Sequence, residues 1–235
     1  MRKGLDAPVP PFEHLVVLDF EWTADKQRRM EPCSEITQFP SVLVKLAGRA
    51  TKVIDEFDTF VRPRFNPLLS RFARELTAIT QADVDGAPSL EEVIPRYLAW
   101  LHSHGLAALD GAKIGHWAFC TWSDADVGTQ LATETRTKGI PLPQCFQNWV
   151  DLKPCYRSHF RTEPRGGLQA CVERLGLAWE GRAHNGLVDS QNTSKIVLHM
   201  AQGSYMHGAF VFKRPTRGLD AATGIPFGSA KRKRT

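Results

Sequence analysis

Three apolar segments rich in β-branched residues follow one another near the start of the chain. They are residues 14–20 (HLVVLDF), 41–48 (SVLVKLAG) and 52–63 (KVIDEFDTFVRP). Their length and spacing are typical of strands joined as hairpins or a meander. The chain is therefore expected to open with an antiparallel sheet.

The rest of the chain alternates between strand-like and helix-like segments. Residues 89–105 have apolar side chains at helical spacing, with Ser89 as the N-cap, Glu92 three residues later and Gly105 as the stop. Strands first, and then strands alternating with helices, predict an α/β fold in which a mixed β-sheet is flanked by α-helices. The further strands are expected at 112–122 and 146–153, and the further helices at 126–138, 166–176 and 188–202.

One domain with two short extensions is expected. The 235 residues, of which 42% are hydrophobic, are enough to build the core of a single large domain. The predicted boundaries are an N-terminal extension at 1–12, the domain at 13–203 and a C-terminal basic tail at 204–235. The tail ends in KRKRT (231–235), which is typical of a nuclear localisation signal or of a contact with phosphates. Solvated charge without a function is the third interpretation.

Composition favours an intracellular protein, cytoplasmic or nuclear, that does not enter a membrane. No segment reaches the roughly 20 apolar residues of a membrane span, and the start lacks the apolar core of a secretory signal. The five cysteines are scattered and form no CxxC pair, so they indicate neither a disulfide framework nor a structural zinc site. A net charge of +5 is compatible with a polyanionic partner but is common among proteins that bind no nucleic acid.

Two acidic residues lie where the first strand should still be apolar, in VVLDFEW (16–22). Residues two apart in a strand point to the same face, so Asp19 and Glu21 would lie side by side and repel each other. A divalent cation between them removes the repulsion, and oxygen ligands of this kind suit Mg²⁺ or Mn²⁺. The alternative is that the strand ends at Leu18 and both acids are solvated.

Two later segments add to the acidic residues. Asp124 and Asp126 lie at a strand-to-helix transition, where an aspartate either caps the helix or holds a metal ion. In GRAHNGLVDSQNTSKI (181–196), a turn separates His184 from Asp189, and a helix begins near the aspartate. That arrangement can bring an imidazole and a carboxylate to one place, although such a pair alone is more often a surface pair.

Together these segments resemble the DEDDh 3′-5′ exonucleases of the ribonuclease-H-like superfamily, which includes ribonuclease T and proofreading subunits. That family carries DxE on its first strand, a mid-chain Asp, and HxxxxD before its last helix. The matching positions here are Asp19, Glu21, Asp126, His184 and Asp189. The likeness is greatest to the histone-mRNA and RNA-interference (Eri-like) branch and covers roughly residues 13–201. Its segments are VVLDFEWT, SEITQFPSVLVKL, ELTAITQADVD and GLQACVERLGLAWEGRAHNGLVDSQNTSKI.

The chain departs from the family pattern at positions that are not metal ligands. Trp22 bears most on substrate fit, because a large ring in place of the family's Ala either narrows the entrance or provides a stacking platform. The other departures are Ala78 for Gly, Ser123 for Gly, Ala125 for Trp and Val188 for Asp.

The resemblance implies a metal-dependent 3′-5′ exonuclease that releases nucleoside monophosphates. Asp124 falls at a variable position of the family, so the metal is assigned to Asp126. His184 would be the general base. Two Mg²⁺ or Mn²⁺ ions would be held by Asp19, Glu21, Asp126 and Asp189.

The resemblance also implies where the substrate binds. Phe20, through its backbone, Trp22, Leu76 and Thr77 would hold the 3′-terminal nucleotide. Core packing is the alternative for the last three. The expected partner is single-stranded or 3′-overhang nucleic acid, and RNA is preferred because the Eri-like branch acts on RNA ends. No protein partner is indicated.

Two other functions stay open. A DNA 3′-5′ exonuclease of repair or proofreading type would differ in its relative rates on matched RNA and DNA oligomers. A non-catalytic RNA-binding scaffold on the same fold would be indicated by the loss of an acid or of the histidine, and all five residues are present.

Overall fold

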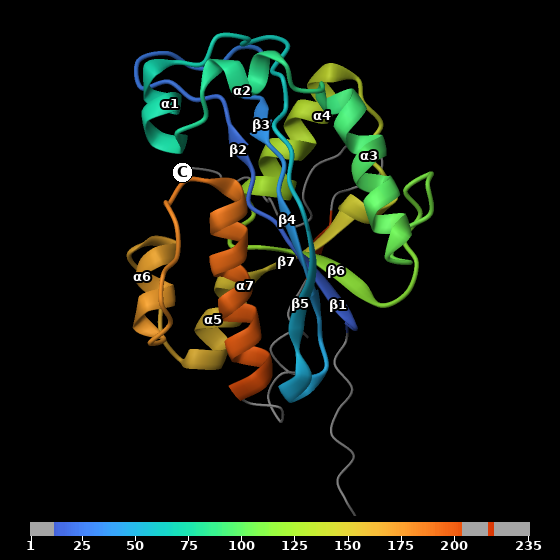
Figure 1. The fold of residues 1–235 in the computed structure, drawn as a ribbon, viewed down its shortest axis with the longest axis vertical. Helices are drawn as coiled ribbons and strands as arrows, with labels where there is room; N and C mark the ends of the chain where they lie inside the picture. The colour runs from blue at the N-terminus through green and yellow to red at the C-terminus, as the bar shows by residue number, and fades with distance from the viewer. Residues whose placement is uncertain (1–11, 204–215, 219–235) are drawn as a thin grey trace, which may run out of the picture.

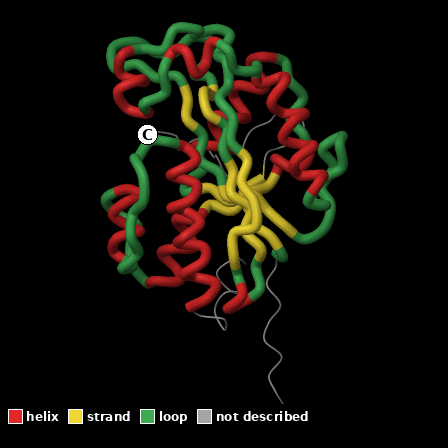
Figure 2. The backbone as a smooth tube through the Cα atoms, viewed as in Figure 1, coloured by secondary structure: helices red, strands yellow, loops and turns green. Residues whose placement is uncertain are grey.

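A mixed β-sheet lies at the centre of the molecule, with helices on both faces (Figures 1 and 2). The computed structural model describes residues 12–203 and 216–218. The strand order is β5-β4-β1-β6-β7-β8. Strand β6 is parallel to both β1 and β7, and the other neighbouring pairs are antiparallel. The bounds are β1 His14–Val17, β4 Ser41–Lys45, β5 Lys52–Phe57, β6 Trp117–Thr121, β7 Asn148–Asp151 and β8 Thr216–Gly218. The predicted mixed α/β fold is confirmed.

The first strand is shorter than the sequence predicts. β1 ends at Val17, and after it the backbone N–H of Leu18 donates a hydrogen bond to the carbonyl of Cys120 at 3.0 Å. The chain then leaves the central sheet and forms β2 (Glu21–Trp22), which pairs with β3 (Ile36–Gln38) in a separate two-stranded sheet. The prediction that one strand carries both acids on one face was therefore wrong, because Asp19 follows β1 whereas Glu21 begins β2.

The helices form two layers and a cap (Figure 1). The predicted helices are confirmed near their expected positions, and the predicted strand at 146–153 ends early because a helix begins after Asp151. One face of the sheet carries α3 (Leu90–Ser103), and η2 (Ala125–Leu131), which continues into α4 (Ala132–Lys138). The opposite face carries α5 (Leu152–Phe160), α6 (Gly167–Arg174) and α7 (Gly186–Gly203). Helices α1 (Arg71–Thr77) and α2 (Gln81–Asp85) lie near β2 and β3, and the two short 3₁₀ turns are η1 (Gly48–Ala50) and η3 (Gln144–Gln147).

The side chains of β1 point alternately to the two faces of the sheet, which explains why helices cover both faces. Val16 packs in the core on the side of α3 and η2, whereas Leu15 and Val17 pack in the core on the side of α5, α6 and α7. Because successive strand residues point to opposite faces, a continuous apolar run is required of a strand that is covered on both sides. The apolar run that predicted this strand therefore also reflects its central place in the sheet.

Three sequence-based predictions concern the cap of α3, the cysteines and membrane-spanning segments. The backbone N–H of Ser89 donates to Oε2 of Glu92 at 2.8 Å, which is one half of the predicted capping box at the start of α3. All five cysteines are buried free thiols, as expected for a chain without a disulfide framework. Among the helices of the described residues, none combines the length and the apolar character that crossing a bilayer requires.

Strand β8 lies inside the segment that was predicted as a tail. Its backbone pairs with β7, with Thr216 opposite Val150 and Gly218 opposite Asn148. The rest of the predicted tail, including KRKRT, lies outside the described residues, as does nearly all of the predicted N-terminal extension.

Candidate active site

A cavity of about 420 Å³ opens where the parallel strands end. Sites in α/β sheets generally form at the carboxyl ends of such strands, because the side chains that follow neighbouring strands converge there. In this chain Asp19 follows β1, Asp126 follows β6 and Lys153 follows β7, and all three line the cavity. The cavity is lined by every residue predicted for the site: Asp19, Phe20, Glu21, Trp22, Leu76, Thr77, Asp126, His184 and Asp189.

The carboxylate of Asp126 is fixed by the segment that carries Asp19. The backbone N–H of Phe20 donates to Oδ1 of Asp126 at 2.8 Å, which joins the end of β1 to the start of η2. The other candidate, Asp124, does not line the cavity, and its Oδ1 accepts a hydrogen bond of 3.3 Å from the indole of Trp149. The geometry therefore favours Asp126 over Asp124 as the metal ligand. The Phe20 side chain is buried in the core against Phe39, so only its backbone is available to a ligand.

His184 and Asp189 come from the loop and first turn that begin α7. The backbone of His184 has a φ of +62°, and its N–H donates to Oδ2 of Asp189 at 3.0 Å. A carboxylate oxygen of Glu21, a ring nitrogen of His184 and a carboxylate oxygen of Asp189 lie within 4.8 Å of one another. The predicted meeting of the imidazole and the carboxylate is thus present, and it includes the second acid of DxE.

The start of α7 approaches the end of β1 closely at Gly186. A Cβ atom at this position would lie 2.5 Å from the backbone oxygen of Asp19 and 2.9 Å from Cγ of Pro40. The N–H of Gly186 donates to Oε1 of Gln38 at 2.9 Å, and Nε2 of Gln38 donates to Asp58 at 3.0 Å. Gln38 therefore helps to place the loop that carries His184. It lies inside the quoted segment SEITQFPSVLVKL, but no role was predicted for it.

The acids of the cavity have raised pKa values in the metal-free chain. Burial, with the charge of Asp189 next, raises the pKa of Glu21 to about 8. Burial likewise raises the pKa of Asp126 to about 7 and that of Asp189 to about 6. Burial, and then the neighbouring charge of Asp126, raise the pKa of Asp19 well above its usual range. Carboxyl groups this close cannot all be charged without a compensating cation.

Two basic residues supply part of that compensation. The Lys153 ammonium group acts against burial and lowers the pKa values of Asp19 and Asp126, and the Arg182 guanidinium group does so for Glu21. Sequence analysis missed both residues. Lys153 lies in α5, which was not predicted, and Arg182 lies two residues before His184 inside the last quoted motif.

The residues predicted to hold a nucleotide differ in which of their groups are available to a ligand in the cavity. Leu76 and Trp22 are half-buried and line the cavity. The hydroxyl of Thr77 is used within its own helix, donating to the carbonyl of Ala73 at 2.9 Å and accepting from the N–H of Ile79 at 3.1 Å. Leu76 and Trp22 are therefore better placed than the Thr77 hydroxyl to contact a ligand.

The residues of the cavity fit a divalent metal ion. Oδ1 of Asp189 is buried and has no hydrogen-bond partner among the described residues. A buried carboxylate oxygen without a partner is costly, and a bound cation removes that cost. A set made mainly of carboxylates suits Mg²⁺ or Mn²⁺ rather than a softer metal.

Comparison with known proteins finds similarity over most of the chain. Residues 16–197 match the RNase T family, which is described as an exonuclease family. ERI1 exoribonuclease 2 of Danio rerio is 37% identical over 200 residues, which are 80% of this chain and 35% of that protein. The 3′-5′ exonuclease Snipper of Drosophila melanogaster is 34% identical over 210 residues, which are 86% of this chain and 74% of that protein. The chain thus spans about a third of the zebrafish relative's length.

A solved structure shows the same fold. It is the nuclease domain of 3′hExo, a DEDDh family member, bound to rAMP. The two chains superpose with a TM-score of 0.74 at 28% sequence identity, over 83% of this chain and 94% of the other.

Proposed function

The chain belongs to the RNase T exonuclease family, and from this membership we propose that it is a 3′-5′ exoribonuclease. It would hydrolyse the phosphodiester bond at the 3′ end of RNA and release nucleoside monophosphates. The observation that carries the proposal is the meeting of four carboxylates and one imidazole in a single cavity at the ends of the parallel strands. A family relative named as an exoribonuclease supports RNA as the polymer.

The carboxylates would hold the cofactor that the family uses. Two divalent ions, Mg²⁺ or Mn²⁺, would supply charge neutralisation at the phosphate and an activated water. The residues that would hold them are Asp19, Glu21, Asp126 and Asp189. The hydrogen bond from Phe20 to Asp126 and the one from His184 to Asp189 orient two of these carboxylates before any ion binds.

His184 would take the proton of the attacking water. It is exposed at the cavity, and its imidazole makes no hydrogen bond within the described residues, so the ring is free to meet a substrate. Imidazole changes its protonation state near neutral pH, which suits a general base, whereas a carboxylate that holds a metal ion is committed as a ligand.

The terminal nucleotide would lie between α1 and the carboxylates. Leu76 and Trp22 would contact its base or sugar, and the backbone at Phe20 borders the same space. Apolar side chains of this kind hold an unstacked base by contact with its flat face. The substrate is therefore expected to be single-stranded or to have a 3′ overhang, since a paired terminal base would first have to be separated.

The proposal is tested with matched RNA and DNA oligomers of the same sequence, labelled at the 5′ end. A 3′-5′ exoribonuclease shortens the RNA one nucleotide at a time in Mg²⁺ or Mn²⁺ and leaves it intact in EDTA. Faster shortening of the DNA would replace the proposal with a DNA exonuclease. Binding without shortening of either polymer would favour a non-catalytic scaffold.

A further inference from the structure

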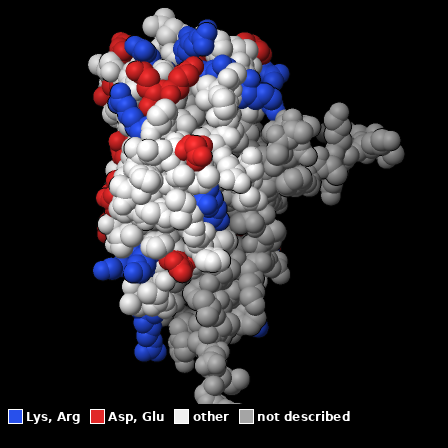
Figure 3. Space-filling view, turned by 90° about the vertical axis from the view of Figure 1, so that its right-hand side faces the viewer, with Lys and Arg blue, Asp and Glu red and all other residues white. Residues whose placement is uncertain are grey.

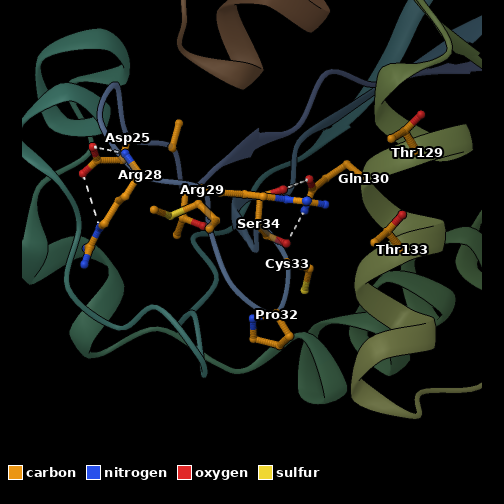
Figure 4. Close-up of a pocket in the computed structure, with 12 residues that line it drawn as sticks. Asp25, Arg28, Arg29, Pro32, Cys33, Ser34, Thr129, Gln130 and Thr133 are labelled. Carbon is orange, nitrogen blue, oxygen red and sulfur yellow. Dashed lines mark hydrogen bonds and ion pairs between the residues drawn. The ribbon is translucent and has the colours of Figure 1, made fainter.

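A second cavity, of about 350 Å³, is shown in Figure 4. It adjoins the active-site cavity, with which it shares a lining residue. One wall is the loop of residues 23–34, which directly follows β2. The opposite wall is formed by Thr129 and Gln130 of η2 and Thr133 of α4. The resemblance to the exonuclease family assigned nothing to this loop, although its sequence, ADKQRRMEPC (24–33), contains three basic residues.

The two cavities are lined by neighbouring segments of the chain and lie next to each other. Ala24 lines both of them. Helix η2 likewise contributes Asp126 to the active-site cavity and, about one turn later, Thr129 and Gln130 to the second. The two cavities therefore share one lining residue and one helix, so a strand held at the carboxylates ends next to the second cavity.

The floor of the second cavity is held in place before any ligand binds. Oγ of Ser34 donates to Oε1 of Gln130 at 2.7 Å, and Nε2 of Gln130 donates back to the Ser34 carbonyl at 2.9 Å. Nε2 of Gln130 also lies 3.1 Å from Glu134, whose carboxylate pairs at 2.8 Å with a buried Lys138. Glu35 pairs with the same Lys138 at 2.9 Å. Such a preorganised floor lowers the ordering cost of binding.

The loop wall of the second cavity presents guanidinium groups, and the helical wall presents hydroxyl groups. The side chains of Arg28 and Arg29 are 66% and 89% exposed, and their ion pairs with Asp25 and Glu31 are each 3.5 Å long. Exposed ion pairs of this length contribute little to stability, so a phosphate can compete with Asp25 and Glu31 for the guanidinium groups. On the helical wall, the hydroxyls of Thr129 and Thr133 make no hydrogen bond within the described part of the chain.

On the face shown in Figure 3, acidic and basic side chains of the described residues are interspersed, so that face carries no continuous basic surface. Arg28 and Arg29 would act on a ligand at short range, because guanidinium groups bind phosphate oxygens through paired N–H donors.

We propose that the second cavity binds another nucleotide of the same nucleic-acid strand as the one in the active site. Its phosphate contacts Arg28 and Arg29, and its sugar or base lies against Thr129 and Thr133. A volume of about 350 Å³ is in the range of small-ligand sites, and the mixture of cations and hydroxyls suits a sugar-phosphate better than an apolar ligand. The inference rests on the proposed function, because the strand must first be placed in the active site.

The test measures binding as a function of strand length. In an Asp19→Asn background, which prevents cleavage, the double variant Arg28→Ala/Arg29→Ala is compared with Lys45→Ala/Lys52→Ala. The lysine variant removes two exposed cations from the place where β4 ends and β5 begins. This place lies beside the start of β1, whereas the active-site cavity lies past the end of β1. Fluorescence anisotropy gives Kd for a labelled RNA 12-mer over a range of salt concentrations, and competition gives Kd for AMP.

The arginine variant should bind the 12-mer about tenfold more weakly, and the slope of log affinity against log salt should fall by about 0.7, the value for the one phosphate that both arginines contact. Its Kd for AMP should change less than about twofold, and the lysine variant should match the parent. Thr133→Phe fills the cavity without changing charge, so it should weaken 12-mer binding with an unchanged salt slope.

Arginine and lysine variants with equal Kd values and equal salt slopes would overturn the inference, as would an equal loss for AMP and the 12-mer. The proposed function is tested separately by cleavage with the wild-type chain. A chain that cleaves RNA but shows no difference between the variants disproves only the second nucleotide site. A chain that does not cleave RNA disproves the proposed function.

Discussion

The guanidinium group of Arg182 donates a hydrogen bond of 2.7 Å to the backbone carbonyl of Glu75, which is 107 residues away in the sequence. The bond joins the loop that carries His184 to the last turn of α1, which carries Leu76 and Thr77. The proposed general base and the proposed nucleotide-binding helix are thereby linked across the active-site cavity. Because His184 has a left-handed backbone conformation, its loop depends on such contacts to stay in place.

Arg182→Ala should therefore lower kcat on an RNA dinucleotide by about fivefold to tenfold, roughly the effect of losing one hydrogen bond with a typical net contribution of about 1 kcal/mol. The Kd for AMP should change less, because Arg182 does not line the cavity. Arg182→Lys should restore part of the rate. Arg74→Ala, which removes an exposed guanidinium from α1, is the control and should leave kcat unchanged. Equal kcat values for the Arg182 and Arg74 variants would rule out this positioning role.

Asp19→Asn should abolish turnover, lowering kcat by about a thousandfold or more, as happens when a catalytic unit loses one member. The metal-free variant should unfold at a higher temperature than the wild type, because one of several crowded carboxyl groups can no longer become charged. Asp124→Asn is the matched control, since Asp124 lies outside the cavity. Oligomer cleavage and thermal melting in EDTA measure both effects. Wild-type turnover by Asp19→Asn would contradict the assignment.

His184→Ala should lower kcat by about 10² to 10⁴, the usual contribution of a general base, while Kd for AMP changes little. The dependence of kcat on pH should also change in the variant, because a general base acts only in its unprotonated form. His116→Ala, which removes an exposed histidine near the start of β6, is the control. A variant with the wild-type kcat and pH profile would show that water is deprotonated without a protein base.

Metal-free stability should fall as the pH rises from about 5 to about 8. Glu21, Asp126 and Asp189 have raised pKa values of about 8, 7 and 6 in the folded chain, against about 4 when unfolded. The folded chain thus binds more protons in this window, and its stability declines as they leave. Mg²⁺ or Mn²⁺ should raise the melting temperature more at pH 8 than at pH 5. An equal increase at both pH values would argue against metal binding by these carboxylates.

Gly186→Ala should disturb the active site through its backbone. The added Cβ would meet the Asp19 oxygen at 2.5 Å, so the start of α7 must move, at a cost of about 1 to 3 kcal/mol. Because Asp189 lies on the same turn, kcat should fall as well. Gly86→Ala is the control, since its Cβ would meet nothing within 4 Å. Chemical denaturation and cleavage rates check the prediction, and equal results for both variants would refute it.

The sequence by itself determined the fold class from local signals, and its resemblance to the DEDDh family pointed to the five residues proposed for catalysis. An apolar β-branched run predicts a buried strand wherever it pairs, and DxE and HxxxxD span only a few residues. The limits of this reasoning are visible at Asp19 and Glu21. Whether a strand continues depends on which backbone lies beside it, and here β3 draws Glu21 into a second sheet.

Only the tertiary structure decided what surrounds those five residues. Phe20 meets Asp126 across 106 positions, Arg182 meets Glu75 across 107, and Gln38 meets Gly186 across 148. A hydrogen bond between residues so far apart depends on how helices and strands pack, and packing leaves no periodic signal in the sequence near either partner. The same holds for the cavity beside the active site, which exists because a loop that follows β2 packs against one side of η2 and α4.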